Sequence, residues 1–447
     1  MSSPHLMPRF HVRPRTGYVN DPNGPIRFGG RYHLYFQYVH DTPRTGPVYW
    51  GHATSADLVG WTIEPEAIVP EPGGLDEGGC WSGNVVSDGE KLYAFYSAFE
   101  PESPFQPVNR AESSDGVTFG NKLRVVEAPA DEGCVQFRDP FVWRQENRWC
   151  MVVGAGVAND VAQARLYESA DLERWSYVGP FTQAPRQGQG TDMDTGMMWE
   201  CPQYASFGDR GALFIGTWAF TGGGTNQVVS LVGTDTGDEL VDPQFRPVDQ
   251  GANFYAPSVL RGEDGRNLLW GWVTEGRTRE WTIEDDWSGF LSLPREIQLD
   301  GDRVASYPAA ELTGLRTGPV GDLDAIPAQC EIEVRFAGDG RLRLGTESGE
   351  HLDLIFDAGV LTLDRSTASR NLRADTGSDR IKLSGPVSLR WFIDGSVSEI
   401  FTSTGHVLTQ RFYPLGRPPW RLSVGGAAEV TVHALRADAV VQPDRPR

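Results

Sequence analysis

Apolar, aromatic-rich runs recur along the first three hundred residues. Each run is rich in β-branched and aromatic residues and is bounded by Gly, Asp or Asn, which is typical of a buried strand. The five runs are RYHLYFQY (31–38), KLYAFYSA (91–98), RWCMVVGA (148–155), ALFIGTWA (212–219) and NLLWGWVT (267–274). Successive runs start 60, 57, 64 and 55 residues apart. This spacing predicts a repeated unit of several strands.

A second marker follows the first three runs in phase with them. The pattern is Ser-x-Asp, three residues, then an aromatic residue, and its copies start at Ser55, Ser113 and Ser169. A unit of about 55–60 residues with several short strands matches a four-stranded propeller blade. Helical periodicity of useful length is missing from this region, which excludes a TIM barrel or a doubly wound sheet. We therefore expect a five-bladed β-propeller over residues 8–306.

Short alternating runs replace the aromatic repeat after about residue 310. They are CEIEVRF, RLRLG, HLDLIF, VSLRWFID, SVSEIF and EVTVHAL. Alternation of this kind predicts half-buried antiparallel strands, and Asp394-Gly395 between two of the runs is a hairpin signal. The predicted fold is thus all-β, a five-bladed β-propeller followed by a C-terminal β-sandwich at residues 318–440.

The net charge of −20 changes the range of partners that we expect. A polyanionic surface is repelled by nucleic acid and by anionic lipid, so neither is expected. The five cysteines include no CxxC pair, which favours neither a disulfide framework nor a zinc site. No apolar signal segment and no run of about 18 apolar residues is present, so we expect a cytoplasmic protein, or a secreted one if a leader was trimmed. Gly222-Gly223-Gly224 lacks the Lys-Ser/Thr of a phosphate loop and is interpreted as a rim loop.

Three carboxyl residues stand early in their repeat units, ahead of an aromatic run. Asp21 lies in YVNDPNG (18–24), Asp139 in FRDP and Glu200 in WECP. The five residues NDPNG are all turn formers and predict a tight turn at Asp21. The early strand of each propeller blade is the innermost, so these side chains should converge on the axis. Carboxyl groups focused on one pocket repel each other, and at least one pKa should rise.

Two carboxyl groups on either side of a cleft are the usual catalytic residues for glycoside cleavage. YVNDPNG resembles the W-M-N-D-P-N-G signature of glycoside hydrolase family 32, the β-fructofuranosidases, levanases and inulinases. FRDP and WECP are similar to the R-D-P and E-C motifs of that family. Further similar stretches are YHLYFQY (32–38), WGHATSADLVGW (50–61), WSGN (81–84), NFYA (253–256), WSGFLSLPRE (287–296) and IDGSVSEIF (393–401). The resemblance runs from about residue 8 to 415.

This resemblance implies a retaining hydrolase that releases fructose from β-D-fructofuranosides such as sucrose, short fructo-oligosaccharides or fructan ends. It implies that Asp21 attacks the fructosyl carbon, that Glu200 is the acid/base, and that Asp139 holds the fructose hydroxyls and favours the transition state. It implies neither a metal nor an organic cofactor. The residues implied to line the fructose site are Asn20, Gln37, Trp81, Ser82, Arg138, Tyr255 and Trp287.

The sequence departs from the family pattern at three places and leaves other functions open. Tyr18-Val19 replaces Trp-Met, no Trp stands between Tyr38 and Trp50, and Asn84 stands where Ser or Ala is common in the family. A fructosyltransferase of the same fold therefore stays an alternative, in which a sugar hydroxyl replaces water. A non-catalytic sugar-binding propeller is disfavoured by the three intact carboxyl residues, and an inverting arabinan-type enzyme by the NDPNG and Glu-Cys motifs. Cys201 has no His placed as its base and is expected to tune Glu200.

The sandwich is open to a structural role, a sugar-binding role or a role in forming a homo-oligomer.

Overall fold

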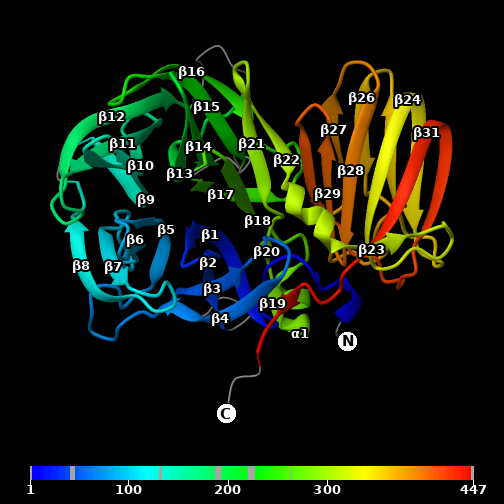
Figure 1. Ribbon diagram of the computed structural model, residues 1–447, viewed down its shortest axis with the longest axis horizontal. Coiled ribbons are helices and arrows are strands. Elements are labelled where there is room, and N and C mark those ends of the chain that lie inside the picture. Colours follow the sequence, from blue (N-terminus) through cyan, green and yellow to red (C-terminus); the bar gives the residue numbers. More distant parts are fainter. Residues whose placement is uncertain are drawn as a thin grey trace.

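A computed structural model describes residues 3–40, 46–129, 133–186, 193–219, 227–262 and 264–443. The chain is all-β, with a β-propeller followed by a C-terminal β-sandwich, as the sequence predicted (Figure 1). The described residues hold only three short helices, η1 (Pro4–Leu6), α1 (Arg279–Asp285) and η2 (Ala310–Leu315), and none of them is long and apolar enough to cross a bilayer. The Gly222-Gly223-Gly224 loop and part of the Tyr38–Trp50 stretch lie outside the described residues.

Three sheets of the propeller have four antiparallel strands each, joined in sequence order. The first contains β5 (Cys80–Ser87), β6 (Leu92–Ala98), β7 (Val108–Ser113) and β8 (Gly120–Val126). The second contains β9 (Cys134–Gln145), β10 (Arg148–Val157), β11 (Val161–Ser169) and β12 (Ser176–Pro185). The third contains β13 (Met198–Phe207), β14 (Arg210–Trp218), β15 (Val228–Asp235) and β16 (Leu240–Pro247).

Two further sheets gain strands from distant parts of the chain. One contains β1 (Gly17–Phe28), β2 (Arg31–Val39), β3 (Tyr49–Ser55) and β4 (Trp61–Ile68), with β19 (Trp287–Ser288) parallel to β1 and β32 (Val440–Val441) parallel to β4. The other contains β17 (Phe254–Arg261), β18 (Asn267–Val273), β21 (Arg295–Asp300) and β22 (Arg303–Pro308), with β20 (Phe290–Leu291) paired to β18. The sheet of β1–β4 is thus extended by β19, which lies far along the chain, and by β32, which follows the sandwich strands.

The aromatic repeat corresponds to one strand position in every sheet. The five runs form β2, β6, β10, β14 and β18, each the second strand of its sheet. The strand before each of them, β1, β5, β9, β13 or β17, packs beside the corresponding strand of the neighbouring sheets. The first strand of each sheet therefore lies nearest the axis, as we expected for the strands that carry the carboxyl motifs.

The Ser-x-Asp marker forms the same turn three times, between the third and fourth strands of a sheet. In the first copy, Ser55 Oγ accepts a hydrogen bond from Leu58 N at 2.9 Å, and Asp57 Oδ1 accepts one from Gly60 N at 2.8 Å. Equivalent bonds hold the turns that begin at Ser113 and Ser169. The side chains satisfy backbone N–H groups that the turn would otherwise leave without partners.

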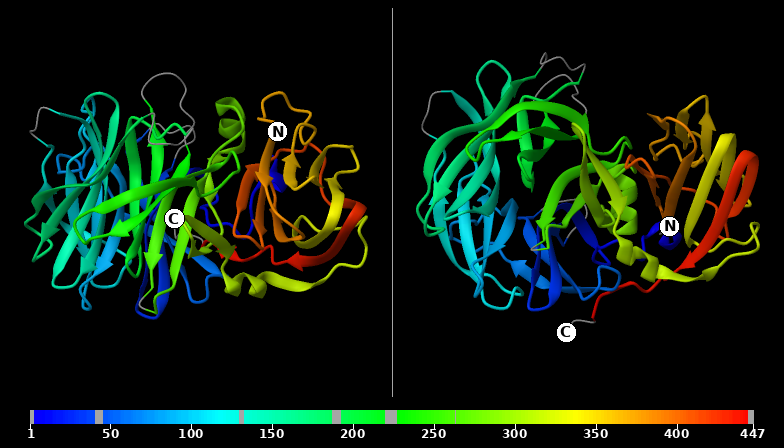
Figure 2. Two further views of the ribbon diagram at one scale, coloured as in Figure 1. Left: turned by 90° about the horizontal axis from the view of Figure 1, so that it is seen from above. Right: turned by 45° about the horizontal axis from the view of Figure 1, so that its top comes forward.

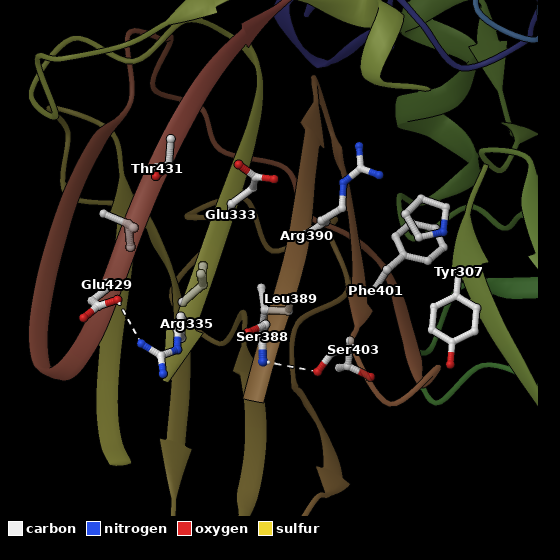
Figure 3. A pocket seen from close by; sticks show the side chains of 14 residues that line it. Tyr307, Glu333, Arg335, Ser388, Leu389, Arg390, Phe401, Ser403, Glu429 and Thr431 are labelled. Atoms are coloured by element: carbon white, nitrogen blue, oxygen red, sulfur yellow. Dashed lines mark hydrogen bonds and ion pairs between the residues drawn. The ribbon is translucent and has the colours of Figure 1, made fainter. Parts of the chain in front are cut away.

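The sandwich packs against the side of the propeller (Figures 1 and 2). Its strands are β23 (Arg316–Pro319), β24 (Gln329–Gly345), β25 (His351–Asp357), β26 (Val360–Asp364), β27 (Ser378–Lys382), β28 (Val387–Asp394), β29 (Val397–Thr402), β30 (Val407–Arg411) and β31 (Arg421–Leu435). The predicted hairpin at Asp394-Gly395 is confirmed, because β28 and β29 pair antiparallel there. A groove of about 400 Å³ separates β22 from the outer face of β24 and β28, with Tyr307 and Phe401 on one side and the Arg335–Glu429 ion pair on the other (Figure 3).

A buried polar network joins the two domains. Asp394, completely buried, accepts hydrogen bonds from the backbone N–H groups of Arg9, Phe10 and His11 at 2.8–3.2 Å. His11 bridges it to Glu399, with Nδ1 2.9 Å from Asp394 and Nε2 3.0 Å from Glu399. The two acidic residues of IDGSVSEIF thus fasten the N-terminal segment to the sandwich.

Candidate active site

The innermost strands share an irregularity at the same end. A β-bulge leaves one or two residues without ladder partners and redirects their side chains. Pairing with the second strand is interrupted between Val19 and Pro22 in β1, Cys80 and Gly83 in β5, Arg138 and Pro140 in β9, Glu200 and Gln203 in β13, and Tyr255 and Ser258 in β17. Asp21, Ser82 and Asp139 lie within these bulges, and Glu200 and Tyr255 lie directly before theirs.

The predicted tight turn at NDPNG is wrong, because residues 18–24 continue β1 as extended chain. Pro22 is tolerated there because the axial edge of an innermost strand needs no ladder N–H. Gly24 has φ 42°, and a Cβ at this position would lie 2.5 Å from Val85 N of the neighbouring sheet. The turn-forming residues therefore build a bulge and a close inter-sheet contact.

Asp21 is held by four donors from four strands. Its Oδ2 accepts hydrogen bonds from Ser82 Oγ and from Gln37 Nε2, the latter at 3.1 Å. Its Oδ1 accepts one from Asn20 Nδ2 at 3.2 Å, and the Cys201 thiol lies 3.5 Å from Oδ2. These donors fix the direction of the carboxyl group.

Asp139 is the most deeply buried of the three carboxyl groups, with 4% of its surface exposed. Its φ of 66° is a strained conformation for a residue with a Cβ, and a hydrogen bond from Asp139 N to Ser97 Oγ at 2.7 Å supports it. Burial raises the pKa of Asp139 to about 7; Arg138 opposes this rise, and Glu200 and Asp21 add to it. The expected rise of at least one pKa in the cluster is confirmed.

Glu200 is fixed at both oxygens. Oε1 accepts hydrogen bonds from Arg138 Nε at 3.1 Å and Nη2 at 2.7 Å, and Oε2 accepts one from Tyr255 OH at 2.6 Å. Arg138 is itself positioned by Gln136 Oε1 at 2.6 Å and by the Trp218 ring, whose centroid lies 5.1 Å from Cζ. Glu200 keeps 19% of its side chain exposed, so it remains within reach of a bound molecule.

Cys201 connects the three carboxyl groups. Its backbone N donates to Asp139 Oδ2 at 3.0 Å, and its thiol lies 3.5 Å from Asp21 Oδ2 and 3.6 Å from Asp139 Oδ2. Burial, Asp139, Asp21 and Glu200 hold the pKa of the thiol well above its usual range. Cys201 is therefore a neutral donor, and the thiol contacts the two aspartates whereas Glu200 is its neighbour in sequence.

Most of these residues lie in the sequence motifs, but three side chains that support them do not. Ser97, Gln136 and Trp218 carry no motif of their own, although Trp218 lies in the fourth aromatic run. Ser97 and Trp218 act through contacts between different sheets, and Gln136 acts on Arg138 of its own strand.

The two predicted tryptophans occupy different surroundings. Trp81 is partly exposed and stacks on Phe99, with 4.3 Å between ring centroids. Trp287 is 1% exposed and lies beneath the guanidinium groups of Arg277, 3.9 Å away, and Arg13, 4.5 Å away. Its ring offers almost no surface to a sugar in this structure, so the contact of Trp287 with a substrate stays a prediction.

The cluster is suited to acid/base chemistry. It combines Asp21, which is held by several donors, Asp139, whose pKa is raised to about 7, and Glu200, which is partly exposed and fixed by an arginine and a tyrosine. Such a set can attack an acetal carbon and transfer a proton to the leaving oxygen. Among the described residues, no group of three or more His, Cys, Asp and Glu side chains is arranged to hold a metal ion.

The propeller fold and its axial carboxyl cluster define a glycoside hydrolase. The model of the glycosyl hydrolases family 32 N-terminal domain matches residues 11–308, and that of the family 32 C-terminal domain matches residues 308–433. The chain belongs to glycoside hydrolase family 32 and is an enzyme of this class.

Similar proteins span the whole chain. A sucrose-6-phosphate hydrolase from Bacillus subtilis (strain 168) is 33% identical over 96% of this chain and 94% of its own length. A raffinose invertase from Escherichia coli is 30% identical over 97% of this chain and 93% of its own length. The solved structure of a family 32 β-fructofuranosidase from Bombyx mori is 27% identical and superposes with a TM-score of 0.81, covering 98% of this chain and 96% of that one.

Proposed function

We propose that this protein hydrolyses β-D-fructofuranosides and releases fructose with retention of configuration. The observation that carries the proposal is the convergence of Asp21, Asp139 and Glu200, from three different sheets, around Arg138 and Cys201. The printed names of the relatives, a sucrose-6-phosphate hydrolase, a raffinose invertase and a β-fructofuranosidase, support a fructose-containing oligosaccharide as substrate.

Asp21 is proposed as the nucleophile. Its four donors hold one carboxylate oxygen toward the axis, where it forms a bond to C2 of the fructosyl unit as the bond from C2 to the leaving oxygen breaks. The product of this step is a fructosyl ester of Asp21. Water then attacks C2 and releases the carboxylate, so two displacements restore the original configuration.

Glu200 is proposed as the acid/base. It gives its proton to the leaving oxygen in the first displacement and takes one from water in the second. The hydrogen bonds from Arg138 and Tyr255 orient it for both steps. Asp139, with its pKa near 7, is proposed to hold fructose hydroxyls and to stabilise positive charge at the ring as the bond to C2 breaks.

Trapping with azide tests these roles separately. Asp21→Ala should lose hydrolysis of an activated fructoside because no ester can form. Glu200→Ala should still form the ester, because an activated leaving group needs no proton, but the attack of water should be slow. Added azide should then give a fructosyl azide of retained configuration from Glu200→Ala and of inverted configuration from Asp21→Ala. Asp171→Ala, which removes a carboxylate from a surface turn, is the control and should behave as the unaltered enzyme. Identical product configurations from the two axial variants would contradict the assignment.

Product chromatography at rising substrate concentration separates hydrolysis from transfer. Sucrose, sucrose 6-phosphate, inulin and levan are the substrates to compare. A hydrolase yields free fructose at every concentration, whereas a fructosyltransferase yields longer oligosaccharides as the concentration rises. Transfer products in excess of free fructose would replace the proposal with the fructosyltransferase alternative.

We also propose that the propeller has five blades and that its boundaries follow the sequence prediction. The succession of contacts β1–β5–β9–β13–β17–β1 supports one blade for each of the five sheets. The boundaries remain at residues 8–306 for the propeller and 318–440 for the sandwich.

A further inference from the structure

A second cavity lies at the opposite end of the innermost strands from the carboxyl cluster. It encloses about 750 Å³ and is lined by the C-terminal parts of β1, β5, β9, β13 and β17. Arg27 follows Asp21 by six residues on β1, and Arg261 follows Tyr255 by six residues on β17. At about 3.3 Å per residue, this rear cavity lies roughly 20 Å from the catalytic cluster.

Three arginines line the rear cavity from three different sheets. They are Arg27 of β1, Arg144 of β9 and Arg261 of β17, and all three are exposed. Across the described ranges of the chain, none of them forms an ion pair with a carboxylate. The one hydrogen bond that any of them makes there is from Arg144 Nε to Glu146 O at 3.1 Å. Most of their N–H groups are therefore available to a ligand.

Aromatic rings hold these guanidinium groups without using their donors. Arg27 Cζ lies 5.8 Å from the Tyr32 ring centroid, Arg144 Cζ 5.1 Å from that of Trp149, and Arg261 Cζ 5.4 Å from that of Tyr204. A stacked guanidinium loses less side-chain entropy when it binds an anion, since its orientation is already restricted.

The cavity is positively charged although the protein has a net charge of −20. Arg266 also lines it but is neutralised by Glu296, 2.9 Å away, and Glu311, 2.6 Å away. Asp264 is the only carboxylate among its described lining residues, and it accepts a hydrogen bond from Arg266 N. Asp235 acts on Arg261 at longer range. Three unneutralised cations thus face one carboxylate within the cavity.

We infer that the rear cavity binds a small phosphate ester of about the size of a sugar phosphate. Guanidinium groups present forked donors that match the oxygens of a phosphate group. A cavity of this volume is within the usual range for small-molecule sites and exceeds the space that a bare phosphate ion fills. A long nucleic acid is disfavoured by the negative charge of the rest of the surface.

Calorimetric titration with glucose 6-phosphate, inorganic phosphate and glucose tests this inference. Glucose 6-phosphate should bind the unaltered protein, inorganic phosphate should bind more weakly, and glucose should not bind at this site. Arg27→Gln/Arg144→Gln/Arg261→Gln should raise the Kd for glucose 6-phosphate by at least about tenfold. If that triple variant fails to fold, Arg27→Gln/Arg144→Gln should still raise it by about threefold.

The matched control changes three exposed arginines away from the cavity. Arg279→Gln/Arg380→Gln/Arg417→Gln removes the same charge and should leave the Kd unchanged. An equal loss in this control would mean a general charge effect, and unchanged binding in the rear-cavity variant would place the ligand elsewhere. Either result, or no binding of glucose 6-phosphate to the unaltered protein, would overturn the inference. None of these measurements depends on hydrolysis, so they stand apart from the test of the proposed function.

Discussion

Two of the carboxyl clusters described above, one at the propeller axis and one at the domain interface, differ in how the charge of each carboxyl group is balanced by cations. At the propeller axis, Arg138 forms an ion pair with Glu200, and its charge only partly offsets the effect of burial on Asp139. The pKa of Asp139 is therefore raised, and the backbone of this residue also has a strained positive φ. This arrangement costs stability and keeps a proton available near neutral pH.

At the domain interface, every carboxyl oxygen faces a cation or a backbone N–H. Burial alone would raise the pKa of Glu399, but Arg295, 2.8 Å away, and His11 outweigh it and lower that pKa. Burial would likewise lower the pKa of His11, but its hydrogen bonds to Asp394 and Glu399 outweigh this and raise it. Residues of the same kind thus support chemistry in one cluster and hold domains together in the other.

The largest expected effect comes from removing the nucleophile of the axial cluster. Asp21→Asn should lower kcat on sucrose, or on whichever fructoside proves the best substrate, by at least about 10³-fold while the protein stays folded. The reason is that the amide cannot form the fructosyl ester, although it fills the same space. Steady-state kinetics and a thermal unfolding curve check both parts; a near-normal kcat would remove Asp21 from the mechanism.

Removing a charge from the domain interface should lower stability, whereas removing the nucleophile lowers activity. Arg295→Met leaves Asp249 and Glu399 buried without their shared cation, so the free energy of unfolding should fall by about 3–5 kcal/mol. Urea denaturation measures this fall. Arg210→Met, which breaks a partly exposed pair with Asp302, is the control and should cost about 1 kcal/mol or less. Equal losses in the two variants would erase the distinction between the clusters.

The sequence predicted the carboxyl residues of the axial cluster but not the network at the domain interface. The phase of the NDPNG, RDP and ECP motifs within an aromatic repeat predicted that the carboxyl groups lie on innermost strands, and they lie on β1, β9 and β13. The prediction of a turn at NDPNG was wrong because local propensity does not show that one edge of β1 faces the axis. Pro22 is acceptable at that edge. The role of Asp394 was missed because its partners at residues 9–11 lie more than 380 positions away.

Replacing the buried carboxyl group of Asp139 by an amide should give a moderate gain in stability at high pH. The folded pKa of Asp139 is about 7, above the usual 3.8, so its protonated form is favoured by folding. Its contribution to stability is complete below pH 3.8 and is lost as the pH rises through about 7. Asp139→Asn should therefore be more stable than the unaltered protein at pH 8, by on the order of 2 kcal/mol, and nearly equal at pH 4. A stability difference that does not change with pH would contradict the raised pKa.

The smallest expected effect concerns the thiol between the two aspartates. Cys201→Ala should lower kcat by no more than about tenfold, because a thiol is a weak donor and the backbone N–H to Asp139 remains. In the folded protein, Cys201 should resist iodoacetamide at pH 8, since its pKa is raised and the residue is buried. Rapid alkylation, followed by mass spectrometry of the Cys201 peptide, would show that the thiolate forms readily.

Each domain of this enzyme is completed by a piece of chain that belongs, in sequence order, to the other. Residues 9–11, at the start of the propeller domain, are held by Asp394 of the sandwich, and β32, at the end of the sandwich domain, extends the sheet of β1–β4. Cutting the chain between the domains would therefore strip a strand from one half and leave a buried acceptor empty in the other. The two domains are expected to fold and melt as a single unit, although each has a hydrophobic core of its own.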